Sequence, residues 1–308
     1  MATSAEVDNS KNDGLVFFGK GVRPFNFEEL ITSQADFLGK GTFGSCYKAD
    51  LEGKGVVVAV IRLKAAGHVP EVEFKERVGR LGELVHENLL SLKAYCCHID
   101  ERLLLCDYMP MGSLSALLHG RKGADKTRLS WKVRSRIAYG VARGIEYLHS
   151  QGPNVCHGNI RSSNVLLTRS YSARISGFGI AQLVSPGSKS NLIPGYHAPE
   201  VTNTEKVSLE ADVYSFGVLL LEMLTGEASL GAISNKKGFD LPKWVRLLFQ
   251  EKPIFDVFDK ELPRNKKTEE EMVQMLQLAI CCTFEYPNNR PSMAAVSNRI
   301  KEVCGVEA

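Results

Sequence analysis

The stretch His157-Gly158-Asn159-Ile160-Arg161-Ser162-Ser163-Asn164-Val165-Leu166-Leu167 decides the fold of this chain. It is a polar turn between an amphipathic helical run over residues 137–148 and a short strand-like segment at its own end. Gly177-Phe178-Gly179 follows thirteen residues after Asn164. This order predicts a loop of polar side chains that a helix and a strand hold in place.

The layout resembles the protein-kinase catalytic loop, His-Arg-Asp-x-x-x-x-Asn, followed by Asp-Phe-Gly. Asn159 stands where that family has its catalytic aspartate, and Gly177 stands where it has its metal-binding aspartate. Gly158 replaces the arginine that would bind a phosphorylated activation loop. The resemblance therefore implies a kinase framework from which several chemical groups are missing.

Composition limits the classes of protein that the chain can represent. Its 308 residues suit two lobes, and its 44% hydrophobic and 24% charged residues are ordinary for a globular protein. The net charge of +3 is too small to indicate nucleic-acid binding, and we expect no signal peptide and a disordered start over residues 1–14. The eight cysteines show no metal-ligand spacing and indicate reduced, buried thiols.

The N-terminal half contains the Gly-rich segment Gly39-Lys40-Gly41-Thr42-Phe43-Gly44, a weak signal by itself. Val58-Ala59-Val60 follows where a kinase has its third strand, and Ile61 occupies the place of the phosphate-binding lysine. Because side chains alternate along a strand, we expect Arg62 and Lys64 to point away from Ile61. Lys40 is then the nearby cation with a route to a phosphate, although such a lysine is also an ordinary solvent-exposed residue.

A helix is expected from Glu71 to Val85. Counting back nine residues from His86 places Arg77 where the family has the glutamate that pairs with the lysine. Glu73 or Glu76 would supply a carboxylate if this register were wrong. Because Ile61 stands in place of the lysine and Arg77 in place of the glutamate, both members of the family's ion pair are absent, and no buried charge is left unpaired.

A change from strand-like to helical composition marks the lobe boundary. We expect a strand at 102–106, a hinge at 107–114 with Cys106 as its gatekeeper, and a long helix from Trp131. Thr268 is predicted to open a later helix through a capping box, and Ser292 to cap the last helix, which runs to Val303.

The resemblance also assigns roles to individual residues. It implies a vestigial nucleotide cleft, an apolar spine and structural anchors, with Ala59 and Leu166 on either side of adenine. The position of Phe178 in the spine is equally consistent with ordinary core packing. The cleft comprises Gly39, Gly41, Gly44, Cys46, Ala59, Cys106, Asp107, Met109 and Leu166, and the spine comprises Leu81, Leu92, His157 and Phe178. The anchors are Asp212 for the loop and the pair Glu200–Arg290, and the vestigial metal ligand is Asn164. The candidate phosphosites are Ser185, Ser188 and Ser190, which are equally consistent with plain loop polarity.

Several phrases narrow the resemblance to plant leucine-rich-repeat receptor-like kinases, among them Asp-Tyr-Met-Pro-Met-Gly-Ser-Leu and Ala-Asp-Val-Tyr-Ser-Phe-Gly-Val. The fold class this implies is α+β and bilobal. We expect an N-terminal segment at 1–27, an N-lobe at 28–109, a C-lobe at 110–303 and a tail at 304–308.

The expected function is that of an inactive kinase domain beneath the plasma membrane. It would bind receptor-like kinases or cytoplasmic signalling proteins, with no cofactor, no metal and no nucleic acid. A weak atypical kinase that uses Lys40 and a metal-independent nucleotide switch are the alternatives. Neutral drift at the altered positions, in a domain whose role lies elsewhere, would explain the loss of the catalytic groups equally well.

Overall fold

The structure is a computed structural model, and it falls into two compact units. Unit 1 comprises Met1–Leu84, Ser91–Tyr108 and Gln182–Ser185, and unit 2 comprises Val85–Leu90, Met109–Ala181 and Pro186–Ala308. The candidate phosphosites Ser185, Ser188 and Ser190 lie outside the described residues. The structure describes residues 14–19, 25–41, 43–51, 53–64, 69–97, 101–120, 128–184, 195–202, 207–229, 240–251 and 254–306.

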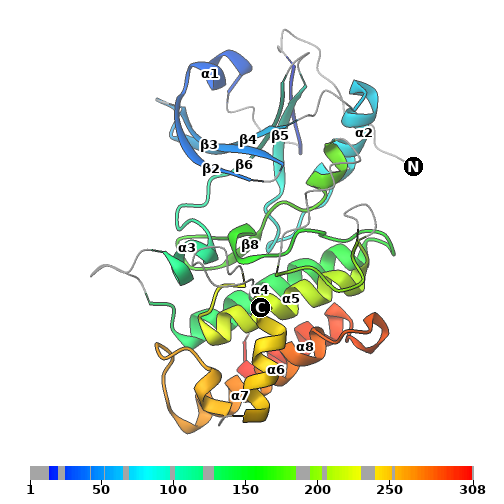
Figure 1. The fold of residues 1–308 in the computed structure, drawn as a ribbon. Coiled ribbons are helices and arrows are strands. Elements are labelled where there is room, and N and C mark those ends of the chain that lie inside the picture. Colours follow the sequence, from blue (N-terminus) through cyan, green and yellow to red (C-terminus); the bar gives the residue numbers. More distant parts are fainter. Residues whose placement is uncertain are drawn as a thin grey trace. The chain divides into compact units, whose positions relative to one another are not determined.

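Unit 1 is built on a six-stranded sheet in the order β1-β5-β6-β4-β3-β2, in which every neighbouring pair is antiparallel (Figure 1). Its helices are α1 (Phe27–Thr32) and α2 (Glu71–Gly82). The strands are β1 (Leu15–Phe17), β2 (Gln34–Lys40), β3 (Gly44–Leu51), β4 (Val56–Leu63), β5 (Leu92–Cys97) and β6 (Arg102–Asp107).

The core on one side of this sheet is made of β-branched and aliphatic side chains. Val58 and Val60 of β4 pack with Leu105 of β6 in one buried cluster, as expected for strands rich in β-branched residues. Leu15 of β1 belongs to the same cluster, and Phe18 packs against Gly82, where an added Cβ would lie 2.2 Å from its ring. The predicted N-terminal segment at 1–27 therefore contains a strand of the sheet.

The Gly-rich segment needs glycine at only one of its three described glycines. A Cβ added to Gly44 would lie 2.1 Å from the carbonyl oxygen of Arg62, because β3 and β4 pair directly at Gly44 and Leu63. A Cβ added to Gly41 would make an ordinary contact, and one added to Gly39 would meet nothing within 4 Å. Gly44 is thus required by the sheet itself.

Replacing Gly44 with alanine should destabilise the chain by about 1–3 kcal/mol, because backbone on the neighbouring strand must move. Gly39→Ala is the matched control from the same segment and should change the free energy of unfolding by less than about 0.5 kcal/mol. Urea unfolding followed by circular dichroism measures both. Equal stability of the two variants would show that the close contact at Gly44 is relieved at no cost.

Unit 2 is mainly helical, with a small two-stranded sheet of β7 (Val165–Leu167) and β8 (Ala173–Ile175). Helix α4 packs against α5 and α8, and α5 packs against α7 (Figure 1). Its other elements are 3₁₀ turns, among them η2 (Ser162–Asn164). The helices are α3 (Leu114–His119), α4 (Trp131–Ser150), α5 (Leu209–Thr225), α6 (Leu241–Glu251), α7 (Lys266–Cys282) and α8 (Met293–Cys304).

Two helix boundaries differ from the sequence predictions. Helix α2 ends at Gly82 rather than Val85. Helix α7 begins at Lys266, and its N-cap is Asn265, whose side chain accepts from the backbone N–H of Thr268; the predicted capping box at Thr268 is wrong because an asparagine, an equally strong N-cap residue, stands three positions earlier. Ser292 does cap α8, as predicted.

Candidate functional site

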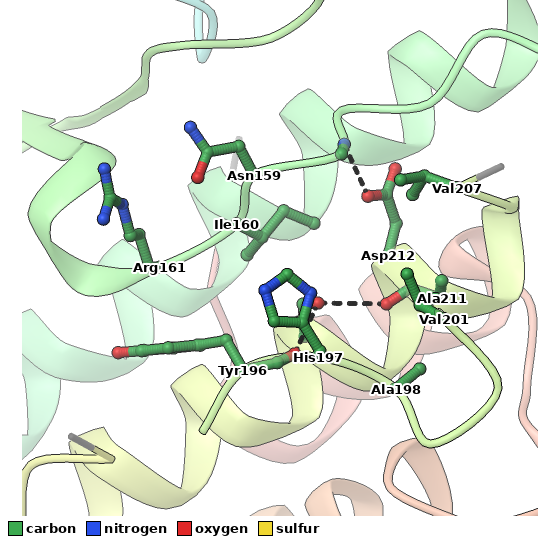
Figure 2. A pocket seen from close by; sticks show the side chains of 12 residues that line it. Asn159, Ile160, Arg161, Tyr196, His197, Ala198, Val201, Val207, Ala211 and Asp212 are labelled. Atoms are coloured by element: carbon green, nitrogen blue, oxygen red, sulfur yellow. Dashed lines mark hydrogen bonds between the residues drawn. The ribbon is translucent and has the colours of Figure 1, made fainter. Parts of the chain in front are cut away.

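The loop that follows α4 is held by one buried carboxylate. Asp212, in the first turn of α5, is 1% exposed. Its Oδ2 accepts from the backbone N–H of His157 at 2.6 Å and its Oδ1 from that of Gly158 at 2.9 Å. Figure 2 shows Asp212 directly beneath this part of the loop. His149 of α4 lies 3.0 Å from the same carboxylate through Nε2, so Asp212 joins α4, α5 and the loop.

Removing the Asp212 side chain should be costly, because buried donors on two elements lose their acceptor. We expect Asp212→Ala to lower the free energy of unfolding by about 3–5 kcal/mol and Asp212→Asn to lower it by about 1–3 kcal/mol. The control is Glu302→Gln, which breaks an exposed pair with Arg299 and should cost less than about 0.5 kcal/mol. Urea unfolding measures the free energy of unfolding of each variant. A loss below about 1 kcal/mol in Asp212→Ala would contradict this anchoring role.

A second buried carboxylate ties the end of the loop to the segment before Ala198. Glu222 of α5 is 2% exposed and accepts from the hydroxyl of Tyr196 and, at 2.8 Å, from that of Ser162. His119 of α3 lies 2.6 Å away. Burial, followed by the Glu222 charge, raises the pKa of the Tyr196 hydroxyl well above its ordinary value. This network fixes the position of Tyr196 relative to the loop.

His157 is buried against Phe178, with the two rings edge to face at 6.3 Å between centroids. Its Nδ1 accepts from the backbone N–H of Asn159 at 3.2 Å, so the proton of the neutral ring is assigned to Nε2, which has no hydrogen-bond partner. Burial lowers the pKa of His157 to about 4, although the Asp212 charge opposes the shift. The ring is therefore neutral at pH 7 and serves as an apolar packing group.

This pKa predicts a loss of stability in acid. Below pH 6.5 the unfolded chain binds a proton at His157, whereas the folded chain stays neutral until about pH 4. The free energy of unfolding should fall by about 3 kcal/mol from this residue as the pH falls through that window, at 1.36 kcal/mol per pKa unit. His157→Phe should remove this part of the pH dependence, which urea unfolding at pH 7, 5.5 and 4.5 measures. An unchanged pH profile in His157→Phe would contradict the buried neutral histidine.

At the chemical positions of the loop, Asn159 replaces a carboxylate of the family pattern, Asn164 keeps the family's asparagine, and Gly177 replaces a second carboxylate. Asn164 is oriented by the bond from its Nδ2 to the carbonyl of Asn159 at 2.7 Å, and its own carbonyl accepts from the N–H and Oγ of Ser176. Gly177 has a φ of +86°. A Cβ there would lie 3.4 Å from Asn164 Nδ2 and 3.5 Å from Asn159 Nδ2. The structure therefore brings Asn159, Asn164 and Gly177 together.

The altered positions of unit 1 lie on β4 and α2. Ile61 is half-buried and pairs with Cys46 of β3 and Leu104 of β6. Arg77 forms an ion pair with Glu73 of its own helix, and Glu76 pairs with Arg80 in the same way. The carboxylates that a register error would have supplied are thus already paired along α2.

Lys64 is a second cation near the Gly-rich segment, and the route from Lys40 to a phosphate stays a prediction. Lys64 Nζ donates to the carbonyl of Gly41 at 3.3 Å, whereas Lys40 is exposed at the end of β2. Lys64 lies one residue beyond the end of β4, where the regular alternation of faces no longer applies. Arg62, inside the strand, does point outward and pairs with Glu101.

The predicted cleft residues fall in both units. In unit 1, Ala59 and Cys106 are neighbours across β4 and β6 and are both buried, and burial raises the pKa of the Cys106 thiol to about 12. In unit 2, Leu166 forms a β-bridge with Ser113. All eight cysteines are free thiols. Gly39, Gly41, Gly44, Cys46 and Asp107 belong to unit 1, and Met109 to unit 2.

The predicted spine and anchors are mostly buried. Leu81 and Leu92 in unit 1, and His157 and Phe178 in unit 2, are each less than 10% exposed. The pair of Glu200 and Arg290 is present and bidentate, at 2.6 and 2.8 Å. Arg290 also stacks over the ring of Tyr214 at 5.0 Å, so the end of the activation segment is fixed to α5 and to the turn before α8.

A small recess opens between the loop and the segment that carries Tyr196 (Figure 2). Arg161 and His197 both line it, and Nε of Arg161 and Nε2 of His197 are buried there without a hydrogen-bond partner. Burial lowers the pKa of both side chains. The cavity measures about 20 Å³, which is the space of a single water molecule.

Sequence reasoning missed Glu222, Ser162, His119 and Arg161 as members of this site. Glu222 interrupts the apolar run Val218–Leu224. A carboxylate in such a run requires buried partners, and this was the available signal. Nothing in the sequence distinguishes Arg161 from a solvated arginine.

Within the described ranges, no group of three or more His, Cys, Asp or Glu side chains could hold a metal ion. None of the helices in those ranges combines the length and the apolar character that crossing a bilayer requires.

An antiparallel first unit, a helical second unit and an Asp212-anchored loop before β7 define a protein-kinase fold. The family of protein tyrosine and serine/threonine kinases matches residues 32–300, and the chain belongs to it. The predicted α+β kinase fold is confirmed by two solved structures. The pseudokinase domain of BIR2 has a TM-score of 0.79 at 30% identity and covers 96% of this chain and 91% of its own. The maize SIRK1 kinase domain bound to AMP-PNP has a TM-score of 0.82 at 31% identity, and the match covers 94% of this chain and 99% of that domain.

Curated relatives confirm the resemblance to plant receptor-like kinases. The probable inactive receptor kinase RLK902 of Arabidopsis thaliana is 51% identical over 97% of this chain and 47% of its own length. The probable leucine-rich repeat receptor-like protein kinase At1g68400 of the same plant is 44% identical over 98% of this chain and 46% of its own length. The chain therefore spans about half the length of these curated relatives.

Proposed function

We propose that this chain is a catalytically inactive receptor-like kinase domain that signals by binding other proteins. The observation that carries this proposal is the cluster of Asn159, Asn164 and Gly177, where amide nitrogens converge on the position of the missing metal-binding carboxylate. Phosphoryl transfer depends on positioning and on neutralising charge around the phosphates. A cluster without carboxylates has no strong ligand for magnesium, which prefers charged oxygen ligands.

The other altered positions act in the same direction. Asn159 cannot accept the proton of a substrate hydroxyl, a contribution of about 10²–10⁴-fold in rate. Ile61 removes a cation from the phosphates, and Arg77 is engaged by Glu73. Such losses are not additive, but together they should reduce turnover to below detection. Several relatives are named as probable inactive receptor kinases, which supports this conclusion.

The setting we propose is the inner face of the plasma membrane, in a single-pass receptor with leucine-rich repeats. Partners would be other receptor-like kinases or cytoplasmic signalling proteins. The relatives of about twice this length are named as receptor kinases, which supports the proposal.

A second candidate function is a nucleotide switch that needs no metal. It is favoured by the SIRK1 kinase domain, a structural neighbour that holds AMP-PNP. The atypical kinase that relies on Lys40 is weakened by the exposure of that side chain on β2.

The inactive domain should transfer no phosphate from labelled ATP to a generic protein substrate with magnesium or manganese. Wild type and Asn164→Ala should give the same background, because no metal is held through Asn164. ATP with magnesium should raise the melting temperature no more than ATP alone, because ligand binding stabilises the native state by mass action.

Transfer that Asn164→Ala abolishes would overturn the proposal, and transfer that Lys40→Ala abolishes would establish the atypical kinase. A magnesium-independent rise in melting temperature with ATP would support the nucleotide switch.

A further inference from the structure

Arg102, the first residue of β6, is a buried arginine whose guanidinium is only partly satisfied. The residue is 7% exposed. Its Nη2 donates to the carbonyl of Val69, and its guanidinium carbon lies 4.4 Å from the centroid of the Phe74 ring. The other terminal nitrogen, Nη1, is buried without a hydrogen-bond partner. Because a buried donor without an acceptor is costly, an acceptor that formed beside Nη1 would be stabilised.

Two neighbouring carboxylates already have partners. Glu71, the first residue of α2, forms an ion pair with Lys75 one turn later. Glu101 pairs with Arg62 of β4. Among the residues that the structure describes, Arg102 forms no ion pair with a carboxylate. Its charge is therefore open to a new anion.

The side chain that faces Arg102 across the sheet is the thiol of Cys97, the last residue of β5. The two residues are directly paired in the β5–β6 register, and directly paired residues of antiparallel strands share one face of the sheet. Cys97 is a half-buried free thiol. Burial raises the pKa of this thiol, and the charge of Arg102, the charge of Lys75 and a hydrogen bond from Arg102 oppose the rise. The guanidinium thus lies against the sulfur.

Oxidation would turn this thiol into the acceptor that Nη1 lacks. Thiol sulfur is a weak acceptor, whereas oxygen is a strong one. The Cys97 thiolate would attack hydrogen peroxide, so that an S–O bond forms while the O–O bond breaks, and the leaving hydroxide takes up the thiol proton to become water. Sulfur loses two electrons and the peroxide gains them. The resulting sulfenate would accept a charge-assisted hydrogen bond from the Arg102 guanidinium.

Carboxylates rather than cations act on two of the other half-buried thiols. Burial and then the Asp212 charge raise the pKa of Cys156 to about 12. Burial and then the Glu271 charge raise the pKa of Cys304 to about 12. A negative charge on an oxidised sulfur is opposed at both places, because like charges repel. At Cys97 the same charge would meet a guanidinium.

We propose that Cys97 is a redox modification site, at which hydrogen peroxide forms a sulfenate that Arg102 holds. The site lies where α2 begins, since the same guanidinium contacts Val69 and Phe74. It lies in unit 1, apart from the altered loop of unit 2, and its chemistry requires no phosphoryl transfer. A thiol reductant would restore the free cysteine, because the sulfenate is the reversible step of cysteine oxidation.

The test exposes the whole chain to hydrogen peroxide at pH 8.5, where more of the thiol is ionised, and then removes the peroxide with catalase. Remaining thiols are blocked with N-ethylmaleimide, and peptide mass spectrometry counts the oxygen added at each cysteine. Cys97 should gain one oxygen, and dithiothreitol should restore its thiol.

Arg102→Gln should lower the yield of this product by about tenfold or more, through loss of a charge-assisted hydrogen bond. Oxidation of Cys281, a half-buried thiol of α7, should stay the same in this variant. The matched control is Arg62→Gln, which removes an arginine of the same sheet that pairs with Glu101 and should leave the yield at Cys97 unchanged.

Circular dichroism shows whether Arg102→Gln is folded. If it is not, Lys75→Gln is the deciding variant, because its side chain is 48% exposed and its charge also acts on the Cys97 thiol; the yield should then fall by about twofold, as for an exposed charge. A fall at Cys97 alone supports the site. No added oxygen at Cys97, an unchanged yield in the deciding variant, or an equal fall at Cys281 overturns it.

Discussion

The Asp212 carboxylate is the constraint on which the geometry of unit 2 depends. It accepts from the backbone of His157 and Gly158 and contacts His149 of α4, so the loop keeps its path whatever its outward side chains are. Because the anchor acts on backbone groups, substitutions at Asn159 or Gly177 do not loosen it. A domain built in this way can lose its catalytic groups and still present a fixed surface.

The charges are lost in ways that the fold tolerates. A buried charge without a partner costs several kcal/mol, whereas removing both partners avoids that cost. Ile61 is packed among Cys46 and Leu104, and Arg77 is neutralised by Glu73 on its own helix. Gly177, with φ at +86°, adopts a backbone conformation that glycine takes without strain. Each position is thus locally satisfied rather than damaged.

Sequence reasoning located the elements whose signals are local or fixed in spacing. The Ser292 cap followed from such a pattern, whereas the Glu200–Arg290 pair followed from the resemblance to the kinase family. Contacts between distant segments could not be read in the same way. The packing of Phe18 on Gly82 and the bond from Lys64 to Gly41 depend on how strands end and turn. The polar network around Glu222 joins three segments, and its only signal in the sequence was a carboxylate inside an apolar run.

The carboxylates of unit 2 show which charges the fold itself requires. Where carboxylates remain in this part of unit 2, they bind backbone or partner side chains and are structural. Where carboxylates of the family pattern have been replaced, at 159 and 177, the side-chain amides of Asn159 and Asn164 lie beside Gly177. Neutral drift and use of the domain as a binding surface both account for this pattern, because neither leaves a buried carboxylate unpaired. Both accounts require the same inactive chemistry, and they differ only in whether the surface of the domain is used for binding.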